Sequence, residues 1–329
     1  MEFLGFGRSG ISVSTIGLGT WPIGGARYGE RDDGAAVAAI QAAVDAGVTC
    51  FDTAPSYGNG NAEELLGSAL KGRRDDAVVI TKGGLVWDDR SHVLGRNGRP
   101  EYLAARLDES LTRLGTDHVD LFLIHWPDLD TPLAETMGGL ETLVASGKVR
   151  AIGVSNFTGA QLREAAASLS TTRLAANQIS YSLFDRRWAA DAFAACRDLE
   201  IGVMAYGPLA HGLLAGAFSR ETVFDAADWR SSGVIFGQAL LTPENFARNL
   251  DIVDRLASIA ADLDLTLPQL ALAWTLHDPI VTNALVGART GDEIRTAVPA
   301  SGATIPPEAM RAIDAAMSDA VGMTTELPV

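Results

Sequence analysis

The sequence has little of what disulfide-stabilised, metal-binding or nucleic-acid-binding proteins need. It contains two cysteines, Cys50 inside an apolar run and Cys196 inside a helical pattern. Because both thiols lie within patterns typical of a core, we expect them to be buried. Two cysteines are too few for a disulfide framework and form no cluster of metal ligands, so we expect no metal site. Lysine and arginine number 26 against 41 aspartates and glutamates, a formal net charge of −15. Because that field repels phosphate backbones, we expect no nucleic-acid partner.

Long apolar runs are also missing. No segment approaches the roughly 18 uninterrupted apolar residues of a membrane-spanning helix, and the first ten residues show no basic leader followed by an apolar region. We therefore expect a cytoplasmic protein without a membrane partner. Hydrophobic residues still make up 47% of the chain, enough to fill a large core. Single α/β barrels reach this length, and nothing marks a boundary, so we expect residues 1–329 to form one domain.

Short β-rich runs alternate with amphipathic helical patterns along most of the chain. In residues 100–114, for example, leucines recur at helical spacing after Pro100, and Gly115 is placed to end the helix. Eight runs have the character of strands. They lie at residues 16–19, 48–51, 77–80, 119–124, 150–154, 175–178, 201–205 and 283–286. Eight strands in β-then-α order predict a parallel sheet closed into a (β/α)8 TIM barrel.

The first fifteen residues follow a different pattern. Residues 2–6 and 11–15 flank Gly7-Arg-Ser-Gly10 and predict a β-hairpin that closes the barrel floor. The run from Gly5 to Gly10 also matches the dinucleotide fingerprint G-x-G-x-x-G, which requires a helix beginning at its third glycine. A β-branched, helix-poor stretch follows instead, so the hairpin interpretation is favoured.

Four ionisable side chains stand at or just past the ends of consecutive predicted strands. Asp52 ends the second strand, and Tyr57 follows five residues later on a short loop. Lys82 ends the third strand and His125 ends the fourth. Each residue alone would be an ordinary turn, packing or surface residue. In a parallel barrel these strand ends converge on one rim, where barrel enzymes place their chemistry.

Together these four residue types suit the protonation of an oxygen that becomes an alkoxide as hydride reaches carbon. A tyrosine can act as a general acid if its pKa falls from about 10 toward neutral pH. The Lys82 ammonium can supply part of that shift for Tyr57, and Asp52 can keep the lysine charged. His125 can orient the substrate oxygen through a hydrogen bond.

These residues resemble the aldo-keto reductase superfamily over nearly the whole chain. The matching motifs are GLGTW at 17–21, FDTAPSYG at 51–58, TK at 81–82, LIHWP at 123–127, GKVRAIGVSNF at 147–157, NQ at 177–178, YGPL at 206–209 and VGAR at 286–289. The resemblance implies a (β/α)8 barrel and reversible NAD(P)(H)-dependent reduction of an aldehyde or ketone. It also implies that Tyr57 donates the proton, that Lys82 and Asp52 tune it, and that His125 orients the carbonyl.

The resemblance further implies a set of cofactor contacts. Ser155, Asn156 and Gln178 are expected at the nicotinamide carboxamide, and Tyr206 is expected to stack on the nicotinamide ring. The remaining cofactor positions implied by the motifs are Thr20, Trp21, Asp52, Gly207, Pro208, Leu209, Gly212, Leu214, Gly287, Ala288, Arg289 and Glu293. Residues 207–243 form the longest irregular segment, which is typical of a lid.

The adenosine end departs from the family pattern, because Glu293 and Ala297 replace a commonly found glutamine and asparagine. Arg289 could pair with a 2′-phosphate, which favours NADP(H). Glu293 could repel that phosphate or accept hydrogen bonds from a free ribose diol, which would favour NAD(H). NADP(H) is the favoured expectation.

The substrate pocket is predicted from aromatic residues near the rim. Trp21, Trp87 and Trp126 are expected to contact a small carbonyl or alcohol substrate, together with Tyr57, His125 and the loop around residues 207–243. No anion-binding cluster accompanies them, which argues against a strongly anionic substrate. A monomer is the default expectation for this family.

Three alternatives to a carbonyl reductase remain open on the sequence. One is a cofactor-binding regulatory subunit without significant turnover, like the potassium-channel β subunits that share this fold. Another is an NAD-dependent sugar- or pyridoxal-type dehydrogenase, which would carry the same four residues. The third is a barrel hydrolase or isomerase that uses the same rim without a cofactor.

Overall fold

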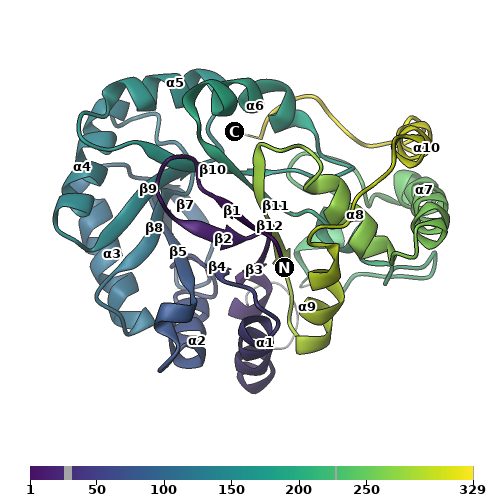
Figure 1. Ribbon diagram of the computed structural model, residues 1–329, viewed down its shortest axis with the longest axis horizontal. Coiled ribbons are helices and arrows are strands. Elements are labelled where there is room, and N and C mark those ends of the chain that lie inside the picture. The colour runs from purple at the N-terminus through teal and green to yellow at the C-terminus, as the bar shows by residue number, and fades with distance from the viewer. Residues whose placement is uncertain (26–31, 227, 329) are drawn as a thin grey trace.

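The chain folds around a closed barrel of eight parallel strands, seen in the computed structural model, which describes residues 1–25, 32–226 and 228–328 (Figure 1). The barrel strands are β3 (Ile16–Gly19), β4 (Cys50–Asp52), β5 (Val78–Gly83), β8 (Val119–Ile124), β9 (Val149–Ser155), β10 (Leu174–Ser180), β11 (Gly202–Tyr206) and β12 (Val281–Gly287). They pair in chain order, and β12 closes onto β3. The predicted (β/α)8 barrel is confirmed, and each of its strands matches a predicted run.

Helices surround the barrel wall (Figure 1). They are α1 (Asp33–Asp45), α2 (Asn61–Ala69), α3 (Pro100–Leu114), α4 (Leu133–Ala145), α5 (Gly159–Ser168), α6 (Arg187–Leu199), α7 (Pro243–Asp262), α8 (Leu267–Thr275), α9 (Gly291–Ala297) and α10 (Pro307–Met317). The predicted limits of α3 are confirmed: Pro100 opens the helix, and Gly115 ends it with a left-handed backbone (φ 64°). Among the described residues no single helix is long and apolar enough to span a membrane. The helices α7 and α8 together have the length and the apolar composition of such a span, but they are bent by 87° relative to each other.

The predicted N-terminal hairpin is present as β1 (Phe3–Gly5) and β2 (Ser12–Ser14), which pair antiparallel. Its side chains Phe6, Ile11 and Val13 are buried against inward-facing residues of the barrel. The Asn283 side chain donates a hydrogen bond to the Ser14 carbonyl near the amino end of β12. The hairpin therefore closes the floor, and the G-x-G-x-x-G run forms its turn rather than a phosphate-binding loop.

Two regions beyond the barrel strands differ from the expected simple loops. A second hairpin, β6 (Leu85–Trp87) and β7 (Val93–Arg96), follows β5 directly. The long segment 207–243 contains two 3-10 helices, η3 (Ala210–Ala215) and η4 (Trp229–Ser232). Other 3-10 turns lie at η1 (Trp21–Gly24), η2 (Arg74–Asp76) and η5 (Val298–Ala300).

Candidate active site

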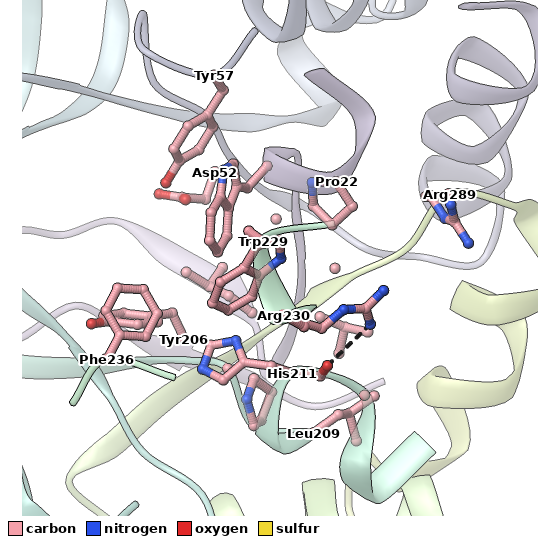
Figure 2. Close-up of a pocket in the computed structure, with 18 of the residues that line it drawn as sticks. Pro22, Asp52, Tyr57, Tyr206, Leu209, His211, Trp229, Arg230, Phe236 and Arg289 are labelled. Atoms are coloured by element: carbon pink, nitrogen blue, oxygen red, sulfur yellow. Dashed lines mark hydrogen bonds between the residues drawn. The ribbon is translucent and has the colours of Figure 1, made fainter. Parts of the chain in front are cut away.

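A cavity of about 900 Å³ opens at the carboxyl ends of the barrel strands. Its volume lies within the range of roughly 300–1,000 Å³ found for small-molecule and cofactor sites. Figure 2 shows Tyr57 and Asp52 on one side of this pocket and Arg289 on the far side. The predicted site residues that line it are Trp21, Asp52, Tyr57, His125, Trp126, Ser155, Asn156, Gln178, Tyr206, Gly207, Pro208, Leu209, Gly212, Gly287, Arg289 and Glu293.

The four predicted catalytic residues lie together at one end of the cavity. Lys82 is fully buried, and its Nζ donates hydrogen bonds to Asp52 Oδ1 at 2.7 Å and to the Thr53 carbonyl at 2.9 Å. The same ammonium lies 3.3 Å from the Tyr57 hydroxyl oxygen. The His125 ring stands edge-on to the Tyr57 ring, with centroids 5.8 Å apart. The carboxyl ends of parallel barrel strands thus bring together residues that are far apart in the sequence.

Burial dominates the electrostatics of this group. It lowers the pKa of Lys82, whereas Asp52 and, more weakly, Glu63 raise it. Burial raises the pKa of Asp52, and the lysine opposes this shift. The pKa of Tyr57 is raised well above 10.0, first by burial and then by the Asp52 carboxylate. The pKa of His125 is lowered well below 6.5 by burial and by the Lys82 charge. At neutral pH the phenol is therefore protonated and the imidazole is neutral.

The residues expected at the nicotinamide are joined to the catalytic group by side-chain hydrogen bonds. Gln178 Nε2 donates to Asp52 Oδ2 at 2.7 Å, and Ser155 Oγ donates to the Gln178 carbonyl at 2.8 Å. Asn156 Nδ2 donates to the His125 carbonyl at 3.1 Å, and the Tyr206 hydroxyl donates to Asn156 Oδ1 at 3.0 Å. This network holds amide and hydroxyl groups beside Asp52 and His125.

Glycines in left-handed conformations shape the middle of the cavity. Gly207 has φ 64° and Gly212 has φ 107°. A Cβ at Gly207 would lie 3.0 Å from the His211 ring, and one at Gly212 would lie 2.7 Å from the Phe218 ring. Side chains there would be strained and crowded, so glycine keeps this backbone close to whatever fills the cavity.

The far end of the cavity holds the residues expected at the adenosine phosphates. Arg289 and Glu293 both line it. Glu293 Oε2 accepts hydrogen bonds from the backbone N–H groups of Arg289 at 2.6 Å and Thr290 at 3.4 Å, so its carboxylate caps α9. These groups fit a nicotinamide dinucleotide. The amides at one end suit its carboxamide, and the guanidinium at the other end suits its adenosine phosphates, with the glycine backbone lying between them.

Five predicted site residues do not line the cavity. Lys82, Thr20, Leu214 and Ala288 are fully buried around it. Trp87 lies outside the lining, and its Nε1 donates to Asn59 Oδ1 at 3.0 Å. The pairing of β6 with β7 is irregular just before Trp87, and such irregularities re-aim side chains. The position of Trp87 therefore does not support the predicted contact with substrate.

The long segment 207–243, expected to form part of the substrate pocket, lines the cavity with residues that the sequence did not single out, notably Trp229, Phe236 and His211. Their rings approach one another at centroid distances of 5.2–5.9 Å (Figure 2). The Trp229 ring also lies 5.0 Å from the Trp21 ring. Phe236 has a left-handed backbone (φ 45°), and the buried Arg187 guanidinium donates to its carbonyl at 3.0 Å. The segment's length and aromatic content were the only sequence signals for this wall.

Known proteins resemble the chain over almost its whole length. The sequence profile of the Aldo/keto reductase family matches residues 15–318. "Aldo-keto reductase YhdN" of Bacillus subtilis is 34% identical over 98% of this chain and 95% of its own. "NADH-specific methylglyoxal reductase" of Escherichia coli is 35% identical, over 91% and 93%. The solved glycerol dehydrogenase AKR11B4 from Gluconobacter oxydans superposes with a TM-score of 0.86 and 34% identity, covering 96% of this chain and 94% of that one.

Proposed function

Because the chain belongs to the aldo/keto reductase family and is an NAD(P)H-dependent carbonyl oxidoreductase, we propose that Tyr57 is the proton donor of its reaction. The observation that carries this role is the 3.3 Å contact between the Tyr57 hydroxyl and the buried Lys82 ammonium. The pair lies at one end of a cavity that is large enough for both a cofactor and a small substrate.

The chain's own residues perform the acid–base and orienting work. Tyr57 remains protonated because its pKa is raised, and it donates its proton to the carbonyl oxygen. Lys82 then stabilises the phenolate, and the hydrogen bond from Lys82 to Asp52 anchors the ammonium. The neutral His125 imidazole donates a hydrogen bond that orients the same oxygen. A bound reduced nicotinamide supplies the hydride.

We propose that the cofactor extends from the amide residues beside Asp52 to Arg289. Ser155, Asn156 and Gln178 would hold the carboxamide, and the Tyr206 ring would support the nicotinamide. NADPH is proposed as the better cofactor, because the Arg289 guanidinium can pair with a 2′-phosphate. The NADH-specific relative makes NADH the alternative.

The substrates proposed are small neutral aldehydes and ketones, or the corresponding alcohols. The cavity walls include the apolar and aromatic residues Trp21, Trp126, Val93 and Phe236. Of the charged lining residues outside the catalytic group, Arg289, Asp292 and Glu293 belong to the opposite end, and Arg230 forms an ion pair with Asp228. Methylglyoxal and glycerol, named in two of the relatives, are also small and neutral.

Tyr57→Phe tests the proton-donor role. We expect kcat for carbonyl reduction to fall by a factor of about 10²–10⁴, the usual contribution of a general acid, while cofactor affinity is retained. Turnover is followed by the absorbance of the reduced cofactor with methylglyoxal, benzaldehyde and pyruvate, and cofactor binding by quenching of protein fluorescence. Neutral carbonyls should be turned over faster than pyruvate.

The matched control is Tyr102→Phe, which removes a hydroxyl outside the cavity that donates to the Leu85 carbonyl at 2.7 Å. It should keep turnover near the wild-type value. Wild-type-like turnover in Tyr57→Phe would contradict the mechanism. Cofactor binding by the wild-type protein without turnover of any carbonyl in the panel would favour a regulatory subunit.

A further inference from the structure

A buried polar network lies on the opposite face of β5 from the cavity. Thr81 directly precedes Lys82, and because side chains alternate along a strand, the two point to opposite faces. Thr81 Oγ1 donates to Glu63 Oε1 at 2.6 Å, and Arg113 Nε donates to Glu63 Oε2 at 2.7 Å. Glu63 and Thr81 are completely buried, and none of the three residues lines the cavity.

This network connects the loop that carries Tyr57 to the strand that carries Lys82. Glu63 is in the first turn of α2, where the neighbouring Ala62 N–H donates to the Tyr57 carbonyl at 3.2 Å. The Arg113 side chain also packs directly on the loop: a Cβ at Gly60 would lie 2.6 Å from its Cδ. Any displacement of this turn relative to β5 therefore displaces Tyr57.

A carboxylate suits this task better than an apolar contact. Burying a charge is costly unless it is paired and hydrogen-bonded, and both Glu63 oxygens have partners. Hydrophobic contacts are non-directional, whereas hydrogen bonds fix distance and angle. The contact between Lys82 Nζ and the Tyr57 hydroxyl oxygen is sensitive to small displacements. Its distance of 3.3 Å is already beyond the usual hydrogen-bond range of about 2.7–3.2 Å.

We propose that Glu63 is a positioning residue for proton transfer. Through Thr81 and Arg113 it holds the Tyr57 hydroxyl within reach of Lys82, without touching substrate or cofactor. This inference rests on the proposed role of Tyr57 as the proton donor.

The first test compares Glu63→Gln with Glu64→Gln, an identical charge change at an exposed position of the same helical turn. We expect Glu63→Gln to lower kcat by about tenfold or more, since small misplacements of reacting groups can cost about 10²-fold. The KM for the carbonyl and the cofactor dissociation constant should stay within about twofold, because general binding is not affected. The solvent deuterium isotope effect on kcat should rise as proton transfer becomes slower. Glu64→Gln should behave like the wild type.

A second pair of variants removes any dependence on whether Glu63→Gln folds. Thr81→Val removes the hydroxyl at nearly constant shape, and Thr81→Ser keeps it. Thr81→Val should lower kcat and raise the isotope effect, and Thr81→Ser should restore both. Wild-type values in Thr81→Val, or equal losses in both variants, would overturn the inference.

The two proposals fail in different ways. If Tyr57→Phe is inactive while Glu63→Gln and Thr81→Val keep wild-type kcat and isotope effects, only the positioning role of Glu63 is overturned. If Tyr57→Phe keeps wild-type turnover, the proton-donor role is overturned and the positioning role falls with it.

Discussion

Tyr57 and Lys82 show how burial changes the chemistry expected from residue types alone. Their proximity favoured a tyrosine pKa lowered toward neutral by the ammonium. In the structure burial and the Asp52 carboxylate raise the pKa of Tyr57 instead. Burial removes more solvation free energy from the phenolate than the Lys82 charge supplies in stabilisation, because the nearby Asp52 carboxylate offsets that charge. A phenol that stays protonated is the form that a proton donor requires.

The pH dependence of reduction should reflect the neutral state of His125. Burial and the Lys82 charge lower its pKa well below 6.5, so the imidazole gains no proton as the pH falls from 7.5 to about 6. We therefore expect kcat to show no titration with an apparent pKa near 6.5. A pH–rate profile with saturating substrate and cofactor checks this. A titration near 6.5 that disappears in His125→Asn would contradict it.

Glu293 should weaken the binding of NADPH relative to NADH, because its carboxylate lies beside Arg289. Glu293→Gln removes the charge, and its amide oxygen can still accept the capping hydrogen bonds of α9. We expect the ratio of kcat/KM for NADPH to that for NADH to rise by about 5–10-fold, which corresponds to about 1–1.4 kcal/mol. Steady-state kinetics with both cofactors measure the ratio.

The control for this substitution is Glu308→Gln on α10, which makes the same charge change outside the cavity. It should leave the ratio unchanged. An unchanged ratio in Glu293→Gln would contradict a role of this carboxylate in cofactor choice. Higher wild-type kcat/KM with NADH than with NADPH would overturn the proposed preference for NADPH.

At the scale of elements, the N-terminal hairpin shows why a motif needs its context. Its glycine pattern matches a dinucleotide fingerprint, but β2 follows where that fingerprint needs a helix. At Gly7 (φ 48°) a Cβ would lie 2.1 Å from the Glu200 carbonyl oxygen, so the glycine is required by close packing against the floor. The hairpin serves the barrel by covering its interior.

Phe6→Ala tests the stabilising role of this hairpin. The Phe6 side chain is fully buried against the barrel interior, so its removal should lower the free energy of unfolding by about 3–5 kcal/mol. Urea denaturation measures the change. Phe3→Ala is the control on the same hairpin: Phe3 is 49% exposed, and its loss should stay within about 1 kcal/mol. Equal effects of both variants would contradict the role.

The whole molecule combines one barrel with a formal net charge of −15. We propose that residues 1–329 form one domain that acts as a monomer. Light scattering should then give a mass near 34.6 kDa. Thermal unfolding should occur in one transition with equal calorimetric and van't Hoff enthalpies. A mass near twice this value, or two separate transitions, would contradict the proposal.

The sequence by itself determined the barrel, its floor hairpin and the grouping of four ionisable residues, Asp52, Tyr57, Lys82 and His125, at one rim. Strand and helix patterns are local, and parallel strands in a barrel bring their carboxyl ends to one rim, so Asp52, Lys82 and His125 could be placed together in advance. The tertiary structure alone decided which loop residues complete the cavity. Phe236 lines it from a left-handed turn held by Arg187, and Trp87, at an irregular strand pair, does not line it. These directions depend on contacts between distant segments, and local periodicity does not encode them.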